Sequence, residues 1–414
     1  MLIRRATLPD GRVADIRVAD AIVEVAPSLT PQPGEQVLDA KLGTVLPGLH
    51  DHHLHVRAAA AALDSVRVDA QFAHTVAAEH PGTDGWIRAI GYHESVTGEL
   101  DRARLDAVLP DTPLRVQHRS GALWVLNSAA LARIGCTDHP DGRMRSTDSR
   151  LNAIPRRQTD LSELSRHLAG YGVTGVTDAT PGLSSDDIGS LTSGLAQRVR
   201  CLAPGKKILR DDELDHDELT RWIATCHAAD VPVALHCVTT AQLVVALSAL
   251  RAAGTHALDR IEHAAMVPDD SVGDLAASGV TVVTQPNFVA ERGEQYRTDI
   301  AADELAQLWR VGSLIDAGVP VAASTDAPFG ALDPWAAMRA AVSRDIGPAE
   351  QVEPATALRM FLGFAHRPAQ PRRVEPGQPG DLCILAVPPG EALRALASDL
   401  VVATVVGGNP LPIA

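Results

Sequence analysis

The sequence lacks most features of secreted, membrane-bound or nucleic-acid-binding proteins. Its five cysteines are scattered through 414 residues without a Cys-x-x-Cys pair, so we expect no disulfide framework and a cytoplasmic location. No window approaches the roughly 18 uninterrupted apolar residues of a membrane-spanning helix, and polar residues interrupt the N-terminal segment too often for a signal peptide. A net charge of −14 argues against binding to nucleic acid or to an anionic membrane.

Aromatic residues are also scarce, at 3%, but a hydrophobic share of 45% and a charged share of 21% are typical of a soluble globular protein. RRATL, ADIRVAD and AIVEVAP near the N-terminus indicate short strands, as do residues 380–386 and 399–406 near the C-terminus. Because chain termini often lie close together, we expect residues 1–46 and 371–414 to form one small β-sandwich domain.

Between these ends, strand-like and helical segments alternate, which predicts a parallel sheet with crossover helices. Polar residues follow the apolar runs at a regular spacing. His236 follows Lys207 by 29 positions and His263 follows His236 by 27, while Asp326 comes 63 positions later. One βα unit has about 30 residues, and barrel enzymes carry catalytic groups at strand ends. The pattern predicts a TIM-type (β/α)8 barrel, regular or distorted, over residues 47–370.

The sequence leaves two features of this barrel undecided. Seven βα units are clear, and the eighth strand is supplied either by the pair RVRCL and KKIL or by PLRVQHR at 113–119. A link of only a few residues cannot join parallel neighbours, which counts against the first option. The roughly 110 residues before GVTGVTDA exceed a normal connection, so we expect a helical insertion at about 57–150.

The stretch PGLHDHHLHV holds four histidines and an aspartate. Alternate side chains of a strand share a face, so Asp51, His53 and His55 are expected to point one way. A His-x-His pair at a strand end can place two imidazoles on one metal ion, which makes His53 and His55 the expected ligand pair. His50 and His52 are expected to pack toward the helix layer, and Asp51 is expected to support the ligands.

The polar residues at the later strand ends extend this set, because zinc and similar metals accept imidazole nitrogen and carboxylate oxygen. A lysine ligand is unusual. A buried amine near cations loses its proton readily, and the neutral amine can add carbon dioxide to form a carbamate that bridges two metal ions. Lys207 is the expected bridge, and Lys206, on the opposite face of the same strand, is expected to be a surface residue.

These residues resemble the amidohydrolase superfamily. PGLHDHHLH is similar to its PG-(I/L)-x-D-x-H-x-H signature, and GVTGVTD, KKIL, ALH, RIEHA and STDAP follow in the family's order. HRSGALWVLNSAAL resembles a signature of the amidohydrolase-3 branch, which contains N-substituted formamide deformylase-like enzymes. Ala122 stands where that branch usually has histidine, and HCVTT and RDDE also depart from it, which leaves the substrate class open. The resemblance implies these metal ligands: His53, His55, Lys207 as a carbamate, His236, His263 and Asp326.

The resemblance also implies a metal-dependent hydrolase of an amide or related C–N bond in an N-acyl, N-formyl or cyclic substrate. Two divalent ions, with zinc as the expected metal, would activate water, and Asp326 would act as the general acid–base residue. The alternative is a mononuclear deaminase on the same scaffold, with His263 as a catalytic base and no lysine ligand. A non-catalytic scaffold would typically have lost ligands.

We expect a small-molecule substrate as the partner and a homodimer as the candidate assembly. Tyr92, His93 and Glu94 form a polar trio within the expected insertion. The substrate contacts that we expect are Gln117, His118, Arg119, Trp124 and Asn287.

Overall fold

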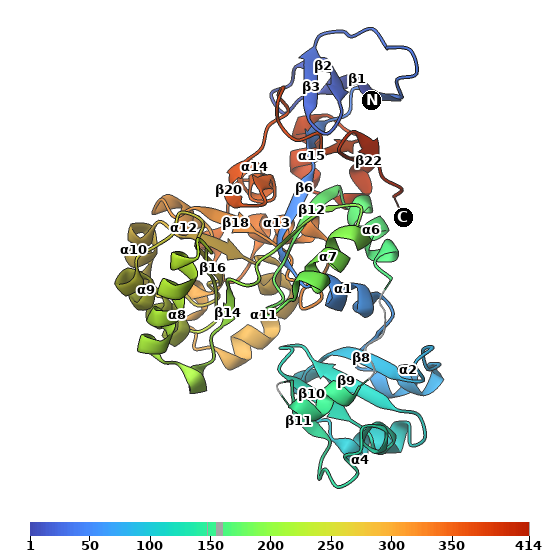
Figure 1. Ribbon diagram of the computed structural model, residues 1–414, viewed down its shortest axis with the longest axis vertical. Coiled ribbons are helices and arrows are strands. Elements are labelled where there is room, and N and C mark those ends of the chain that lie inside the picture. The colour runs from blue at the N-terminus through green and yellow to red at the C-terminus, as the bar shows by residue number, and fades with distance from the viewer. Residues whose placement is uncertain (147, 155–159, 414) are drawn as a thin grey trace. The chain divides into compact units, whose positions relative to one another are not determined.

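The computed structural model describes residues 1–146, 148–154 and 160–413, and the chain divides into two compact units. One unit joins Met1–Val56 to Leu161–Ala414, and the other is Arg57–Asp160. Figure 1 shows the elements of both units, coloured along the chain. Among the described residues, no helix is long and apolar enough to cross a membrane.

Strands from both chain ends form two four-stranded sheets in the first unit, with the orders β3-β2-β1-β4 and β23-β22-β21-β5. The second sheet joins the two ends directly, because β5 (Val45–Pro47) pairs antiparallel with β21 (Leu382–Leu385). Apolar side chains from both ends, among them Ile16, Val45 and Ile384, share one buried core. The other strands are β1 (Leu2–Thr7), β2 (Val13–Val18), β3 (Ile22–Ala26), β4 (Val37–Asp39), β22 (Val401–Val406) and β23 (Asn409–Pro410).

Eight further strands of this unit form two parallel sheets, with the orders β13-β12-β6 and β14-β15-β16-β17-β18. Every residue of β6 and β12 is buried, which is typical of a parallel sheet covered on both faces. The eight strands are β6 (Leu49–Leu54), β12 (Val173–Asp178), β13 (Arg198–Cys201), β14 (Lys206–Ile208), β15 (Ala234–Cys237), β16 (Arg260–His263), β17 (Thr281–Thr284) and β18 (Val321–Ala323).

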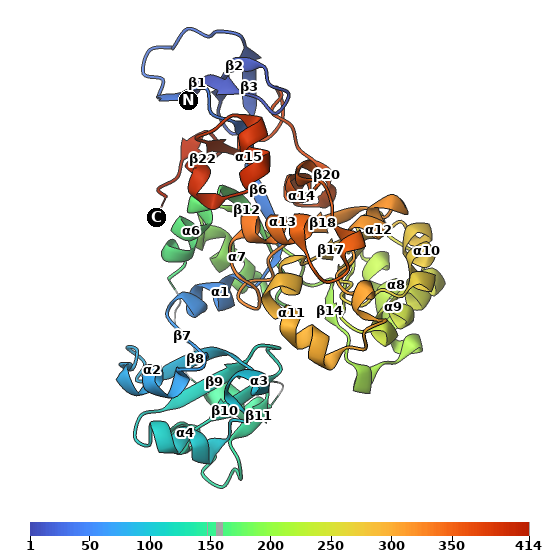
Figure 2. The same ribbon diagram turned by 180° about the vertical axis from the view of Figure 1, so that it is seen from behind.

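Except between β13 and β14, helices alternate with these strands along the chain, as a parallel sheet requires (Figures 1 and 2). The helices before β18 are α6 (Ser162–Gly170), α7 (Ser185–Gly194), α8 (His216–Ala228), α9 (Thr240–Ala253), α10 (Asp269–Ser278), α11 (Asn287–Asp299) and α12 (Gly312–Asp316). After β18 come α13 (Pro334–Ser343), α14 (Pro354–Arg359), the hairpin β19 (Gly363–Phe364) and β20 (Arg367–Pro371), and α15 (Pro389–Ala395).

The two parallel sheets meet where β6 lies beside the segment after β18. The carbonyl of His53 accepts the N–H of Asp326 at 2.9 Å, and the carbonyl of Ala327 accepts the N–H of His55 at 2.9 Å. At the other edges, β13 and β14 are both strands but form no ladder with each other in the described residues. RVRCL and KKIL thus form two separate strands, which belong to different parallel sheets, and the short link between them explains why they do not pair.

The second unit is built around a sheet of order β11-β10-β9-β8-β7, with helices beside it, so the insertion expected to be helical is a mixed α/β unit. Alternate residues of its central strands, such as Ile87, Ala89 and Leu114, pack in a core with α2 and α4. The PLRVQHR segment lies here, as β9. The elements are β7 (Val66–Arg67), α2 (Phe72–Ala78), β8 (Ile87–Tyr92), α3 (Glu94–Thr97), α4 (Arg102–Val108), β9 (Leu114–His118), β10 (Leu123–Leu126), α5 (Ser128–Arg133) and β11 (Arg143–Arg145), with α1 (Val56–Leu63) at the junction of the units.

Candidate metal centre

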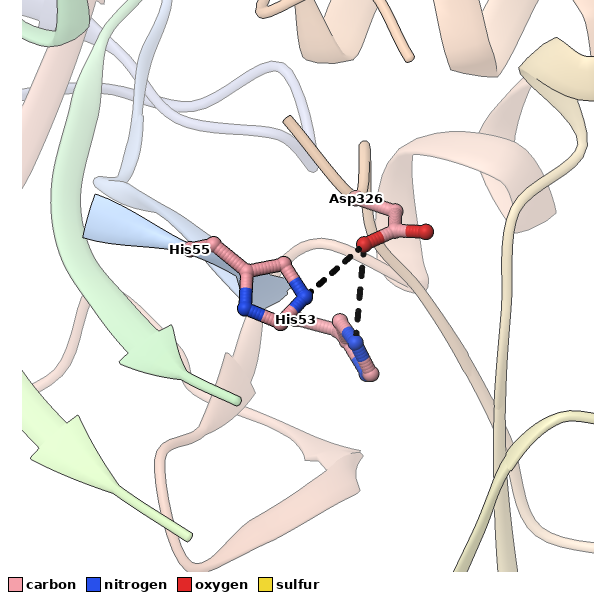
Figure 3. Close-up of side chains that lie close together, drawn as sticks. All are labelled: His53, His55 and Asp326. Atoms are coloured by element: carbon pink, nitrogen blue, oxygen red, sulfur yellow. Dashed lines mark ion pairs between the residues drawn. The ribbon is translucent and has the colours of Figure 1, made fainter. Parts of the chain in front are cut away.

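His53 and His55, at the end of β6, meet Asp326, which follows β18. Asp326 Oδ1 lies 3.6 Å from His53 Nε2 and 3.5 Å from His55 Nε2 (Figure 3). One donor atom from each of the three residues lies within 4.8 Å of the others. The structure thus brings together three of the residues expected at the metal site.

Backbone and side-chain contacts fix Asp326 in this place. Its φ is +55°, a left-handed conformation that costs a non-glycine residue about 1–3 kcal/mol. The buried carboxylate of Asp51 accepts hydrogen bonds from the Thr325 backbone N–H at 3.1 Å and from the Thr325 hydroxyl. Asp51 therefore supports the site by holding the residue before Asp326.

His236 and His263 lie at the ends of β15 and β16. Their rings pack edge to face with centroids 4.4 Å apart, and the His263 ring lies 4.6 Å from that of His53. His263 Nδ1 pairs with Gln285 Oε1 at 2.7 Å, which leaves Nε2 of the ring for another partner. Both histidines thus join the group around His53, as the sequence predicted.

The structure places Lys206, and not the expected Lys207, on the side of β14 that faces the histidines. Lys207 points to α8, where its Nζ donates to Glu218 at 3.3 Å and lies 5.3 Å from the Trp222 ring centroid. Lys206 is only 6% exposed, and its Nζ donates no hydrogen bond to any described residue. Its register partner on β15 is Ala234, and Ile208 pairs with His236, so Lys206 shares the face of β14 that is occupied by His236 on β15.

Glu262 is a buried residue of this site that the sequence reasoning missed. Its carboxylate contacts His53 Nδ1 and accepts hydrogen bonds from Arg260 Nε at 2.6 Å and Arg260 Nη2 at 3.0 Å. A carboxylate on the far nitrogen of a metal-binding imidazole fixes the ring and raises its basicity. The available signal was RIEHA, in which an Arg and a Glu lie two residues apart just before the expected ligand His263.

Burial dominates the electrostatics of the site. It raises the pKa of Asp326 to about 8, although the charges of Arg292 and Lys206 oppose the shift. Burial, together with the charge of Lys206, lowers the pKa of His55 and of His236 to about 3. Burial also lowers the pKa of Lys206 to about 8, against the charge of Glu262. The histidines are therefore neutral at neutral pH, as metal binding requires.

His50 and His52 lie outside the group that meets Asp326. Their rings stack on each other with centroids 4.6 Å apart, and His50 Nε2 pairs with Thr177 Oγ1 of β12 at 2.8 Å. The β6–β12 ladder shifts register both before and after the pairs of His50 and Asp51, so the alternation along β6 is interrupted. The expected packing of His50 and His52 toward the helix layer stays a prediction.

The expected substrate contacts fall in both units. In Arg57–Asp160, Gln117 accepts a hydrogen bond from Arg88 at 3.1 Å, and the Trp124 ring lies under Arg88 and Arg115. His118 and Arg119 belong to the same unit. Asn287 belongs to the other unit, where its amide donates to the carbonyl of Thr325 at 3.2 Å. None of these contacts tests a substrate role, which stays a prediction.

The donor set fits a divalent metal ion. Ligand atoms about 2.0–2.2 Å from one zinc ion lie about 3.3–3.6 Å apart in tetrahedral geometry, which matches the 3.5 and 3.6 Å from Asp326 to the two histidines. Asp326 Oδ1 accepts no hydrogen bond from the described part of the chain. A buried carboxylate oxygen without a donor, facing two imidazole nitrogens, is the arrangement expected of a cation site. The fold and the donors together define the class of metal-dependent hydrolases.

Comparison with known proteins gives the family. The model of the amidohydrolase family matches residues 36–412, so the chain belongs to the amidohydrolase family and is a metal-dependent hydrolase acting on carbon–nitrogen bonds. An N-substituted formamide deformylase from Arthrobacter pascens is 25% identical over 464 aligned positions, which cover 85% of each chain.

Solved structures agree with the fold. A metal-dependent hydrolase from Pyrococcus furiosus superimposes with a TM-score of 0.74 and 18% identity, covering 94% of this chain and 99% of its own. An adenosine deaminase from Xanthomonas campestris with bound zinc gives 0.58 and 16%, covering 100% of this chain and 92% of its own. The mixed α/β fold is thus consistent with a TIM-barrel-type domain.

Proposed function

We propose that the protein hydrolyses the amide bond of a small N-acyl, N-formyl or cyclic amide, with two divalent metal ions, zinc in our proposal. The ligands would be His53, His55, His236, His263 and Asp326, with a carbamate on Lys206 as the bridge. The observation that carries this proposal is the buried Lys206, which lies on the face of β14 that His236 occupies on β15 and whose Nζ has no hydrogen-bond partner among the described residues. We also propose that the two parallel sheets form one (β/α)8 barrel, distorted between β13 and β14, and that the protein works in the cytoplasm.

The reaction needs one proton acceptor and one proton donor. The metal ions would polarise the carbonyl and lower the pKa of water toward about 7. Asp326 takes a proton from the attacking water as the new C–O bond forms, and passes it to the leaving nitrogen as the C–N bond breaks. The products are a carboxylic acid and an amine. Glu262 holds the imidazole of His53 in orientation, and Gln285 does the same for His263.

The proposed bridge requires that Lys206 react with carbon dioxide. A neutral Lys206 amine adds to carbon dioxide, forming an N–C bond and releasing one proton, and the product is a carbamate anion. Burial lowers the pKa of Lys206 to about 8, which makes the neutral amine more accessible than in a surface lysine. Four neutral histidines alone would leave two divalent ions poorly compensated, and a carbamate supplies the missing negative charge.

Arg292 of α11 is the candidate group for a substrate carboxylate. Its guanidinium lies 3.8 Å from the Phe288 ring centroid and donates to the Phe329 carbonyl at 2.8 Å. The Phe329 ring in turn packs on His55 with centroids 5.3 Å apart. A cation held this near the donor group could bind an N-acyl amino acid by its carboxylate. Arg292→Met should then raise KM for carboxylate-bearing substrates more than for neutral amides.

The test is a screen of N-acyl, N-formyl and cyclic amides against zinc-loaded protein. Asp326→Asn is the control, since it keeps the shape of the side chain but cannot accept the proton. We expect amine release by the wild type and a loss of about 100-fold or more in the variant. Activity that survives in Asp326→Asn would refute the mechanism.

A mononuclear aminohydrolase is the second candidate, because only His53, His55 and Asp326 have donor atoms within 4.8 Å of one another in this part of the described chain. It would add His236 as a ligand and use His263 as the base, and it would release ammonia. It needs no lysine ligand. Full activity in Lys206→Met, with one metal ion per chain, would favour it.

A further inference from the structure

A second group of metal-binding side chains lies in the unit Arg57–Asp160. β8 and β9 are parallel neighbours, and Tyr92 pairs with His118 in their register. Their carboxyl ends therefore lie at one edge of the sheet, where α3 begins (Figure 2). His93 and Glu94 follow β8 directly and His118 ends β9, so two imidazoles and a carboxylate gather there. We call these three residues the insert cluster.

Both imidazoles of the insert cluster turn the same nitrogen toward the carboxylate. Glu94 Oε2 lies 3.2 Å from His118 Nε2 and 4.0 Å from His93 Nε2. On the opposite side of each ring, Nδ1 contacts the hydroxyl of the serine two residues later, at 2.8 Å for Ser95 and 2.7 Å for Ser120, and accepts the backbone N–H of the same serine at 3.2 and 3.1 Å. These contacts hold both rings with Nε2 toward Glu94. A metal ion would take the Nε2 lone pair once the ring proton moves to Nδ1, where the serine hydroxyl can accept it.

The two oxygens of Glu94 have different surroundings. Oε1 accepts hydrogen bonds from the Tyr92 hydroxyl at 3.1 Å and from Arg143 Nη2 at 3.4 Å, whereas Oε2 faces the two histidines. Burial alone would raise the pKa of Glu94, but its own backbone N–H, the Tyr92 hydroxyl and the charge of His118 lower it to about 2. Burial lowers the pKa of His118. Glu94 is therefore ionised at neutral pH, and burial favours the neutral form of His118.

We propose that the insert cluster binds one divalent transition-metal ion of the zinc type through His93 Nε2, His118 Nε2 and Glu94 Oε2. Two imidazoles and one carboxylate are a donor set that zinc accepts. The three donor atoms lie within 4.8 Å of one another, so small side-chain rotations bring them onto a common ion. The side chains are 17%, 34% and 16% exposed for residues 93, 94 and 118, which leaves a coordination position for water or an anion.

This assignment gives His118 a different role from the substrate contact that the sequence suggested. The charge of Arg143 opposes a cation, so the ion should be held less tightly than in a site with no basic neighbour. The ion would tie the start of α3 to the end of β9, and binding to the folded state alone would stabilise this unit. The proposal does not rest on the barrel centre, because the two donor groups share no residue.

The experiment compares metal content in full-length, zinc-loaded variants by plasma mass spectrometry. Glu94→Gln keeps an acceptor for Tyr92 and Arg143 but places an amide where Oε2 stood. We expect Glu94→Gln and His118→Ala each to contain about one ion fewer per chain than the wild type. The matched control is His74→Ala, an exposed histidine of α2 in the same unit, which should lose none.

A chelator competition and a zinc anomalous diffraction map complete the test. The weakest zinc affinity of the wild type should fall at least tenfold in Glu94→Gln, and the map should show a peak among the three donor atoms. That peak should persist in the double variant His53→Ala with His55→Ala, which separates this site from the barrel centre. Should His118→Ala fail to fold, Glu94→Gln decides. Unchanged metal content and affinity in Glu94→Gln, or barrel peaks without one at the cluster, would overturn the proposal.

Discussion

The two adjacent lysines of β14 give a matched pair of substitutions with opposite expectations. Lys206→Met removes a buried amine without hydrogen-bond partners among the described residues, whereas Lys207→Met removes a side chain that contacts only α8 in the interactions described. Methionine has a similar length and carries no charge. In our proposal Lys206→Met loses the bridging ligand, so activity should fall by more than the 10–100-fold expected for an outer partner of a metal ligand. Lys207→Met should keep full activity and metal content.

In the metal-free protein, Lys206→Met should increase the free energy of unfolding, although it lowers activity in the metal-loaded protein. The pKa of Lys206 falls from 10.5 to about 8 on folding, mainly through burial. A lowered lysine pKa means that stability is complete above pH 10.5 and is lost as the pH falls through about 8. At about 1.36 kcal/mol per pH unit, the ammonium costs about 3 kcal/mol at pH 7. Lys206→Met should therefore stabilise the metal-free protein by up to that amount, while Lys207→Met should change it by less than about 1 kcal/mol.

The assay is urea unfolding of chelator-treated protein at pH 7, with metal content and amide hydrolysis measured on loaded samples. Acetate added to the smaller variant Lys206→Ala should restore part of the activity, because a free carboxylate can replace the carbamate. Full activity and two metal ions in Lys206→Met would refute the assignment of Lys206, and lost activity in Lys207→Met would restore the original one. A destabilised metal-free Lys206→Met would refute the electrostatic reasoning.

Three further outcomes follow from the same geometry. Glu262→Gln should weaken metal binding by about 10–100-fold, measured by chelator competition, because the imidazole that it orients loses a charged partner; unchanged affinity would contradict that role. Metal binding near pH 6.5 should release the proton of Asp326, whose pKa is about 8, so affinity should rise about tenfold per pH unit below pH 8 and then level off. Calorimetry in buffers of different ionisation enthalpy counts this proton, and zero release would exclude the raised pKa. Gly175→Ala should cost about 1–3 kcal/mol in urea unfolding, since a Cβ would lie 2.5 Å from His50 Nδ1, while the control Gly189→Ala in α7 meets nothing within 4 Å and should cost nothing.

Most of the residues at the candidate metal centre could be predicted because their spacing is periodic. His53, His55, His236, His263 and Asp326 each follow an apolar run, and parallel strands bring such residues to one edge. The five residues lie close together as expected. The parallel strands were equally visible in the alternation of strands and helices, but their division into two sheets was not. The sheet of the insertion was not, because only PLRVQHR, which forms its β9, stood out as a strand candidate in that part of the sequence.

The lysine could not be assigned from the sequence, since β14 has only three residues and two of them are lysines. Alternation says that the two point to opposite sides, but the side occupied by His236 is known only from the register with β15. That register pairs His236 with Ile208 and places Lys206 on the same face. The alternation of side chains along a strand therefore leaves Lys206 and Lys207 as the two candidates. Only the pairing with a neighbouring strand decides which of them faces the site.

Glu262 was missed for a related reason. Strict alternation along β16 would send Glu262 and His263 to opposite faces, so choosing His263 as a ligand implied that Glu262 points away. The backbone breaks the rule at this point, with φ of +72° at His263 and +46° at Ala264. The same left-handed conformation recurs at Asp326. The residues that meet at the site thus depart from regular strand conformation at the strand ends. Sequence periodicity is therefore least informative at the positions that carry the chemistry.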